Sequence, residues 1–451
     1  MVKPETLHAV LNAKTVAVVG ASSNPDKTGY QVLKNIVDGG YQGRIYPINP
    51  RAESILDIDC YPSLLDVPEN LDLVVIIVPA AAVPEVMQQA ADKKAKGAVI
   101  ISGGFREIGN VELENVVMGI ANEHDIAIVG PNCQGINYTP NKLCASWPLL
   151  TKTGGIAVIA QSGTIGATMG GWAEEEAVGF SALLALGNKS GVGEIELLDY
   201  FASDEKTKVI ALNIEGVKDG RAFIETAKSA LLKKTVVVLK PGRTRKGAEA
   251  AQSHTKSIAG SDKVFEAVCK QIGLIRAEGI CEFYDYSKIL SMLDAPRGKR
   301  MLVVTSSGGS GILAADVAED LGIELRKLPT EIKSKLKEIL PNQCVVSNPL
   351  DLTGDATADR YRKALDVAIT SEEIDCILVI FGDPVHNASD VVQDISSRTD
   401  KPIVVAFLGG GDVEKKEVLL MHQAGIPAFP TPERAVRAIG ALLRKKNYAE
   451  L

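Results

Sequence analysis

The chain has 451 residues, of which 46% are hydrophobic and only 5% aromatic, a composition typical of globular proteins with helix-covered parallel sheets. Its net charge of −7 argues against nucleic-acid binding, and no apolar run reaches the roughly 18 residues that a membrane span needs. Seven cysteines without a CxxC pair, and an N-terminus that lacks a signal-peptide pattern, predict a cytoplasmic protein with reduced thiols and no metal site.

Residues 1–145 predict a Rossmann-like domain. Short apolar runs alternate there with helical stretches, which is the pattern of βα units in a parallel sheet. The first run ends in the glycine-rich turn VVGASSNPDKTGY (18–30), and the helix that follows would offer free amides to a phosphate. We expect strands at 15–21, 43–50, 71–79, 96–104 and 126–132.

The end of the second expected strand bears on the ligand of this domain. A dehydrogenase would place an acidic residue there for the ribose hydroxyls, whereas this chain has Asn49, Pro50 and Arg51. A cation suits a ribose that carries an extra phosphate, as in NADP or coenzyme A. The turn spacing is not GxGxxG, and an ordinary tight turn with a solvated Arg51 explains the same residues equally well.

Two further α/β domains follow, at 146–294 and 299–451, separated by the Pro-containing linker DAPRGKR (294–300). Their sequence patterns predict the same arrangement of strands and helices in both domains. Each opens with a strand, a turn of small residues (QSGT or SSGG) and a helix. The later strands also correspond, at 209–216, 234–240 and 272–279 in one copy and 376–383, 401–407 and 424–431 in the other.

The copies differ in one connection, which is about sixteen residues longer in the second domain (240–273) than in the third (408–425). It contains His254, one of five histidines, in the small and polar run AQSHTKSIAG (251–260). This run lacks apolar periodicity and therefore predicts a loop, and loops longer than the fold requires are usually functional or disordered. The other histidines have weaker contexts: His8 and His422 on helical patterns, His124 and His386 in connections.

Two further features of the second domain suggest chemistry. A helix is expected to follow Ser162, Gly163 and Thr164. Backbone amides, a hydroxyl group and the positive end of the helix dipole would then converge on a small anion. The alternative is that Ser162 only caps the helix. Glu215 ends a strand, where a carboxylate could orient an imidazole, or simply be solvated.

Four cations of the long connection would favour the approach of a polyphosphate, although solvation at the surface explains most such runs of charge: Lys240, Arg243, Arg245 and Lys246. The SSGG turn of the third domain is interpreted as a structural cap or a relic.

Four motifs in this order resemble those of the ADP-forming acyl-CoA synthetases and the related α subunit of succinyl-CoA synthetase: GPNCQG (130–135), QSGT (161–164), NIEG (213–216) and SHTKSIAGSD (253–262). The resemblance covers essentially the whole chain and is closest to the α subunit of archaeal-type ADP-forming acetyl-CoA synthetases. It implies an α/β fold, with an N-terminal Rossmann-like CoA-binding domain followed by two flavodoxin-like CoA-ligase domains.

The resemblance also implies roles for residues. His254 would be transiently phosphorylated, Glu215 would support it, and Ser162, Gly163 and Thr164 would hold the phosphate. Where the family commonly has Thr-Gly after the histidine, this chain has Thr255-Lys256. Coenzyme A, as a substrate, would be bound by residues of the first domain: Gly20, Ala21, Ser22, Ser23, Lys27, Asn49, Pro50, Arg51, Val78, Pro79, Ser102, Gly103, Gly104, Phe105, Asn132 and Cys133.

The implied activity interconverts acyl-CoA, ADP and phosphate with an organic acid, ATP and CoA through an acyl phosphate, acetyl being the expected acyl group. The chain has no ATP-grasp domain, so a separate β subunit would bind Mg²⁺ with ADP or ATP, in an α2β2 heterotetramer. The stoichiometry, the acyl group, ADP or GDP preference, the phosphorylated nitrogen and the physiological direction stay open.

Two alternatives come from other classes of protein. An NADP-linked oxidoreductase built on the first domain would leave the QSGT turn and the His254 connection unexplained. A regulatory protein that senses CoA or acyl-CoA on the same fold is disfavoured by the presence of both His254 and Glu215.

Overall fold

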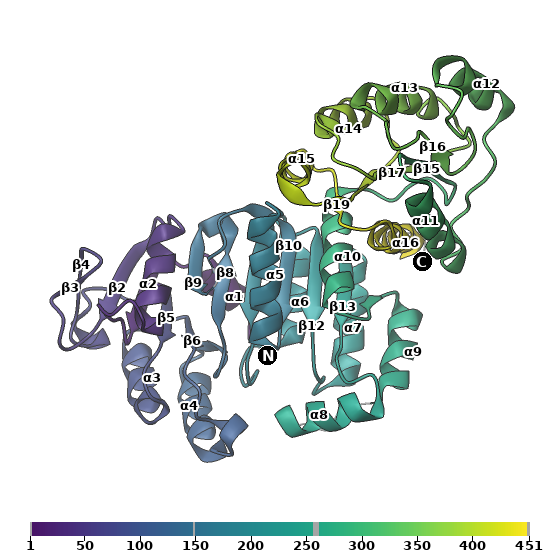
Figure 1. Cartoon of the computed structure of the whole chain (residues 1–451). Coiled ribbons are helices and arrows are strands. Elements are labelled where there is room, and N and C mark those ends of the chain that lie inside the picture. Colours follow the sequence, from purple (N-terminus) through teal and green to yellow (C-terminus); the bar gives the residue numbers. More distant parts are fainter. Residues whose placement is uncertain (1, 148, 256–260, 449–451) are drawn as a thin grey trace. The chain divides into compact units, whose positions relative to one another are not determined.

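The computed structural model describes residues 2–147, 149–255 and 261–448. The chain divides into two compact units, the first of Met1–Glu175 with Gly179–Ile280 and the second of Glu176–Val178 with Cys281–Leu451. Within the described ranges, the strands form three large sheets and a small hairpin of β3 (Ser54–Ile55) and β4 (Ile58–Asp59) (Figure 1).

The first sheet is parallel throughout, in the order β2-β1-β5-β6-β7. All five strands expected from the sequence are confirmed: β1 (Thr15–Val19), β2 (Arg44–Ile48), β5 (Leu73–Ile76), β6 (Gly97–Ile100) and β7 (Ala127–Val129). Its helices are α1 (Pro4–Leu11), α2 (Thr28–Asp38), α3 (Val83–Asp92) and α4 (Val111–Glu123). Four of the five strands are buried along their whole length, which parallel sheets covered on both faces require.

The second sheet has the order β14-β13-β12-β10-β11-β8-β9. Its parallel part consists of β10 (Thr153–Ala160), β11 (Phe180–Ala185), β12 (Val209–Asn213), β13 (Thr235–Leu239) and β14 (Ile275–Ala277). An antiparallel hairpin, β8 (Gly135–Tyr138) and β9 (Leu143–Ser146), pairs with β11. The hairpin extends across the expected boundary at residue 145 and pairs with the second sheet, although most of its residues precede that boundary. The helices are α5 (Gly163–Glu175), α6 (Glu194–Ser203), α7 (Gly220–Leu231) and α9 (Asp262–Ile272).

The third sheet, in the second unit, is parallel in the order β16-β15-β17-β18-β19: β15 (Met301–Thr305), β16 (Leu350–Asp351), β17 (Cys376–Phe381), β18 (Ile403–Phe407) and β19 (Ala428–Phe429). Numbered along the chain, its strands have the order 2-1-3-4-5, as do the first sheet and the parallel part of the second. The helices are α10 (Ile280–Met292), α11 (Gly308–Asp320), α12 (Thr330–Ile339), α13 (Ala358–Ala368), α14 (Ala388–Ser396), α15 (Gly411–Gln423) and α16 (Pro432–Tyr448).

The long connection of the second domain is not a loop throughout, as the sequence predicted, because Arg245–Thr255 forms helix α8. Local interactions explain the helix. The Thr244 hydroxyl accepts a hydrogen bond from the Gly247 amide at 3.1 Å and caps the first turn. Glu249 pairs with Arg245 one turn earlier, and alanines add helix propensity. A solvent-exposed polar helix needs no apolar stripe. The absence of apolar periodicity in this part of the sequence was therefore compatible with a helix as well as with a loop.

One apolar cluster joins the first two sheets. It contains Val16 and Leu73 from the first sheet and Ile159 and Leu212 from the second. Because a continuous core resists separation, most of the first two predicted domains forms one compact unit. The second unit includes Glu176–Val178 and begins at Cys281, earlier than the predicted boundary at residue 294.

The second unit buries a histidine, His422, which is 4% exposed. Its Nε2 accepts a hydrogen bond from the Ala428 amide at 3.2 Å, and its Nδ1 lies 2.9 Å from the carbonyl oxygen of Glu176. Both contacts are satisfied when the ring is neutral with its proton on Nδ1. Burial, reinforced by the neighbouring Lys288 ammonium, lowers the pKa of His422 to about 4.

This burial predicts a pH-dependent loss of stability. Because the pKa is near 6.5 in the unfolded chain and about 4 in the folded one, the unfolded chain binds the extra proton between these values. The contribution is complete above pH 6.5 and is lost as the pH falls towards 4, by about 3 kcal/mol. Urea unfolding measured from pH 7.5 to 4 should be less pH-dependent in His422→Gln than in the wild type. The exposed His386 provides the control, since His386→Gln should leave the pH dependence unchanged; equal slopes in all three proteins would contradict the assignment.

Candidate functional site

The carboxyl edge of the first sheet brings together the first two segments expected to bind CoA. The turn after β1 begins at Gly20, which has a positive φ of 91°. Asn49, at the end of β2, donates a hydrogen bond from Nδ2 to the carbonyl oxygen of Ala21 at 2.8 Å. Its Oδ1 accepts one from the Arg51 amide at 2.8 Å. Asn49 thus joins the two segments, while Pro50 and Arg51, like Ser23 and Lys27, are exposed and Ser22 is partly exposed.

A second glycine, Gly29, allows helix α2 to pack against the backbone of this turn. A Cβ atom at Gly29 would overlap the carbonyl oxygen of Gly20, so α2 packs directly on the turn. In nucleotide-binding turns one glycine serves such close packing of helix and strand. The sequence pattern did not single out Gly29 because the spacing is not GxGxxG.

The other expected CoA segments meet at the same edge. The Ser102 hydroxyl donates a hydrogen bond to the carbonyl oxygen of Val78 at 2.5 Å, and the Asn132 amide donates to the carbonyl oxygen of Ser102 at 2.9 Å. Pro79, Gly103 and Asn132 are exposed at this edge, and Gly104 is partly exposed with a φ of 111°.

Phe105 and Cys133 have a structural role at this edge. The Phe105 ring is fully buried. The Cys133 thiol donates to the carbonyl oxygen of Ile100 at 3.3 Å, and burial raises the pKa of this thiol to about 12. Their side chains therefore anchor loops in the core and do not face solvent.

At the carboxyl edge of the second sheet, the QSGT and NIEG motifs are joined by hydrogen bonds. The Ser162 amide donates to Oδ1 of Asn213 at 3.3 Å, and the Glu215 amide donates to Oε1 of Gln161 at 3.0 Å. Gln161 and Asn213 thereby hold the start of α5 beside the half-buried Glu215. Both residues lie inside the QSGT and NIEG motifs, but the motifs by themselves do not indicate this role.

The GPNCQG motif contacts the same helix start. A Cβ atom at Gly163 would lie 2.8 Å from the side-chain amide carbon of Gln134. A larger residue at this position would have to displace the Gln134 side chain, and the first turn of α5 stays open on the side of Thr164, which is exposed. Three of the four motifs therefore meet at one helix N-terminus, where free amides and the helix dipole favour an anion.

The connection between β11 and α6 lies between these two edges. The Asn188 amide donates to the carbonyl oxygen of Pro131 at 2.9 Å, beside Asn132. Its side chain donates from Nδ2 to Oε2 of Glu107 at 2.6 Å. Burial would raise the pKa of Glu107, but hydrogen bonds from Asn188 and from loop amides outweigh it and lower the pKa. No sequence motif pointed to Asn188 or Glu107, because their contact joins residues distant in the chain.

His254 lies in the last turn of α8, and its side chain is outside the described residues. The expectation that the preceding cations are solvated is wrong for Lys240. This lysine is 4% exposed, its Nζ lies 5.8 Å from the centre of the Phe265 ring, and burial lowers its pKa. Arg243, Arg245 and Lys246 are exposed and form ion pairs.

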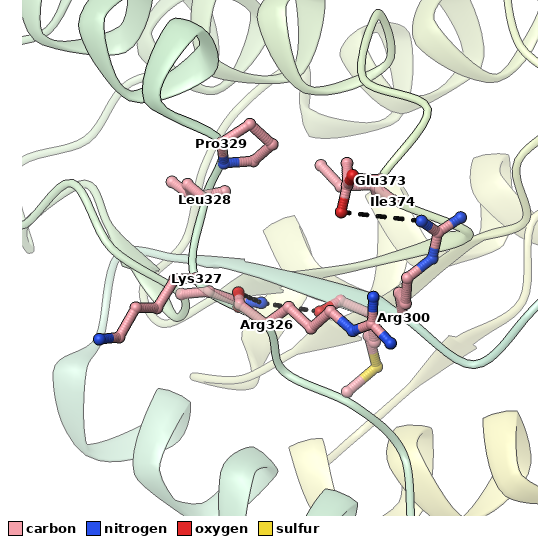
Figure 2. A pocket seen from close by; sticks show the side chains of 9 residues that line it. Arg300, Arg326, Lys327, Leu328, Pro329, Glu373 and Ile374 are labelled. Atoms are coloured by element: carbon pink, nitrogen blue, oxygen red, sulfur yellow. Dashed lines mark hydrogen bonds and ion pairs between the residues drawn. The ribbon is translucent and has the colours of Figure 1, made fainter.

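A small cavity in the second unit does not have the features of a ligand site. Figure 2 shows it beside Arg300 and Arg326. Its volume of about 10 Å³ has room for one water at most. Arg300 is bonded to Asp375 at 2.8 Å, and Arg326 is paired with Glu324 at 2.6 Å, so neither cation offers a free charge to an anion.

The described part of the chain contains no grouping of His, Cys, Asp and Glu that could hold a metal ion. None of its helices has the length and apolar character needed to cross a membrane. In the third domain, Ser307 caps α11 by accepting a hydrogen bond from the Ser310 amide at 3.4 Å, which favours the structural cap among the two interpretations of the SSGG turn.

Three family models match the chain in succession. They are a CoA binding domain at residues 14–139, a succinyl-CoA ligase like flavodoxin domain at 153–290 and a ligase-CoA domain at 301–451.

Individual relatives match over nearly the whole chain. The α subunit of acetate–CoA ligase [ADP-forming] I from Pyrococcus furiosus is 40% identical over 98% of both chains. The 4-hydroxybutyrate–CoA ligase [ADP-forming] of Nitrosopumilus maritimus is 31% identical over 98% of this chain and 64% of that protein. Among solved structures, the acetyl-coenzyme A synthetase 1 of Ca. Korarchaeum cryptofilum in complex with phosphate and ADP has a TM-score of 0.91 and 36% identity, covering 100% of this chain and 98% of that one.

The closed turn predicts opposite effects of two glycine substitutions. Gly29→Ala places a methyl group against a backbone oxygen that cannot rotate away, so it should destabilise the first unit by about 2 kcal/mol or more and weaken CoA binding. Gly119 lies in the exposed interior of α4, where an added Cβ atom would meet nothing within 4 Å, so Gly119→Ala should stabilise by about 0.5–1 kcal/mol. Urea unfolding and CoA calorimetry check both; an unaffected Gly29→Ala protein would exclude the proposed packing.

Proposed function

Because the chain belongs to the family of ADP-forming acetate–CoA ligase α subunits, we propose that its reaction interconverts acetyl-CoA, ADP and phosphate with acetate, ATP and CoA. The observation that carries the proposal is the meeting of QSGT, NIEG and GPNCQG at the start of α5. Acetate is chosen over 4-hydroxybutyrate because the relative named for acetate is more similar, at 40% against 31% identity.

In this proposal the edge of the first sheet binds CoA. The exposed and partly exposed residues of three turns border the ligand, with Lys27 and Asn132 beside it: Gly20, Ser22, Ser23, Val78, Pro79, Ser102, Gly103 and Gly104. Ala21 and Phe105 are buried and support these turns from below. The end of β2 lacks the carboxylate that would select an unphosphorylated ribose, and Arg51 projects there instead. The exposed guanidinium of Arg51 therefore binds the ribose phosphate of CoA.

The N-terminus of α5 holds phosphate and the acyl phosphate in this proposal. The amides of Gly163 and Thr164 and the Ser162 hydroxyl face the anion, and the helix dipole stabilises its charge. Phosphate attacks the thioester carbonyl, the C–S bond breaks, and CoA leaves as a thiolate that takes up a proton. The negative charge that develops on the carbonyl oxygen as phosphate adds is stabilised by fixed dipoles, which need not reorganise during the step.

His254 is the phosphoryl carrier in this proposal. An imidazole nitrogen attacks the phosphorus atom of the acyl phosphate, the P–O bond to the acyl group breaks, and the carboxylate leaves. Glu215, held by Gln161 beside the start of α5, accepts a hydrogen bond from the other ring nitrogen and stabilises the positive ring.

A partner completes the reaction. The Pyrococcus furiosus relative is named as an α subunit, and the Korarchaeum structure was solved with ADP and phosphate. We infer an ATP-grasp β subunit that binds Mg²⁺ with ADP, in an α2β2 assembly. The phosphoryl group of His254 passes to ADP there, with metal and positioning providing most of the catalysis.

The ribose-phosphate contact predicts a ligand preference. Calorimetry should detect CoA binding, about tenfold weaker binding of dephospho-CoA, and no binding of NAD. Arg51→Ala should weaken CoA binding to the level of dephospho-CoA and leave dephospho-CoA unchanged, because the lost partner is the 3′-phosphate. Comparable binding of NAD, or equal losses for both CoA forms, would contradict the assignment.

The carrier role predicts a phosphorylated protein in the absence of the partner. Incubation with acetyl phosphate, or with acetyl-CoA and phosphate, should attach one acid-labile, alkali-stable phosphoryl group, detected by mass spectrometry. His254→Asn should acquire none, whereas the exposed His386→Asn control should label normally. Glu215→Gln should label slowly, because the imidazole loses its orienting acceptor.

The label should remain when Mg²⁺ and ADP are added and should form ATP only after addition of the β subunit. CoA binding by a protein that is never phosphorylated would instead favour a CoA-sensing regulator.

A further inference from the structure

The connection between β11 and α6 buries a lysine directly beside the proposed Glu215 site. Lys189 is 5% exposed, and its Nζ donates a hydrogen bond to the carbonyl oxygen of Gly216 at 2.8 Å. The same ammonium group forms an ion pair with Oε2 of Glu194 at 2.8 Å, and the Glu194 side chain is 4% exposed. A buried ion pair is costly unless its geometry is well satisfied, so the direction in which Lys189 points is strongly determined.

This contact completes the support of the turn that carries Glu215. On the N-terminal side, the Glu215 amide is held by Gln161 at 3.0 Å. On the C-terminal side, the Gly216 carbonyl oxygen is held by Lys189 at 2.8 Å. The turn is therefore anchored on both sides of the Glu215 Cα atom, and this restricts the direction in which the carboxylate can project.

The adjacent residue anchors the loop that the proposed function assigns to CoA. Nδ2 of Asn188 donates to Oε2 of Glu107 at 2.6 Å. The other oxygen of Glu107 accepts hydrogen bonds from the amides of Gly104 and Phe105 at 2.5 and 3.1 Å. Two consecutive residues thus hold loops from two different sheets.

The backbone at Lys189 supports a role beyond pairing with Glu194. Its φ is 56°, in the left-handed region that glycine and asparagine adopt most readily. A lysine there is less favourable for the backbone, and such conformations gather at functional sites. The conformation points successive side chains towards different loops.

We propose that Lys189 is a positioning residue, which holds the Glu215–Gly216 turn in register with the loop at Ser102–Phe105. The inference rests on the proposed function, since it concerns the orientation of the carboxylate that supports the phosphorylated histidine. Lys189 itself does not touch the reacting atoms; it acts through the Gly216 carbonyl group.

The test uses a variant that leaves no unpaired buried charge. Lys189→Met combined with Glu194→Gln removes both charges, and Lys189→Arg keeps a donor. The exposed Lys228→Met on α7 is the matched control. The readouts are the maximal rate of labelling by acetyl phosphate, the acetyl phosphate concentration at half that rate, the dissociation constant of CoA, and the melting temperature.

The double variant should label about 10- to 100-fold more slowly at saturating acetyl phosphate, because a misplaced orienting group lowers the rate of the chemical step. The half-saturating concentration and the dissociation constant of CoA should stay within about twofold of wild type, since those sites are intact. Lys189→Arg should recover most of the rate, and Lys228→Met should match wild type.

Two results would overturn the inference. A folded double variant that labels at the wild-type rate would show that the Gly216 contact does not matter for the step. Loss of rate, CoA affinity and melting temperature together, without recovery in Lys189→Arg, would show a structural role. If this double variant does not fold, Lys189→Gln combined with Glu194→Gln, which also leaves no unpaired buried charge, takes its place with the same expected outcomes. Failure of the wild type itself to label would instead contradict the proposed function.

Discussion

A buried carboxylate, Glu114 on α4, holds the first two sheets in register. It is 1% exposed and accepts hydrogen bonds from Ser190 Oγ at 2.8 Å and Asn188 Nδ2 at 3.2 Å, while Arg106 supplies its cation at 2.8 Å. Removing one hydrogen-bond partner of a buried charge lowers the stability of the fold far more than an exposed ion pair raises it. Because Ser190 and Asn188 are partners of the Glu114 carboxylate, the β11–α6 connection has one favourable position against α4. The apolar cluster shared by both sheets resists separation but does not by itself select a register, because apolar contacts are not directional.

The proposed chemistry depends on that register. The expected CoA loops end the first sheet, and the QSGT and NIEG motifs end the second, so each sheet by itself has only half of the site. Gln134 against Gly163 and Asn188 beside Asn132 are the contacts that join the halves. A nucleophile and its substrate must approach within a few tenths of an ångström of the productive geometry, which explains why polar, directional contacts connect these loops.

The repeated strand order separates the parts of the chain that build the fold from those that carry function. The third sheet repeats the order of the other two, and its SSGG turn is closed by the Ser307 cap. The second domain differs by the connection that contains α8. In the part of α8 whose side chains are described, Arg245, Lys246 and Glu249 are exposed and form ion pairs with one another.

The sequence by itself determined the local structure and the motifs of this protein. Buried β-strands and the four ordered motifs depend on neighbouring residues, because strand periodicity and turn chemistry are local properties of the sequence. The polar helix α8 was missed because capping and ion pairs can form a helix without an apolar stripe. Only the tertiary structure decided that Lys240 and Cys133 are buried and that Asn188, Lys189 and Glu107 support the site. Asn188 and Glu107 are 81 positions apart, and Lys189 and Gly216 are 27 apart; no local pattern encodes such pairs, because they form only when the connections of different strands meet at one edge.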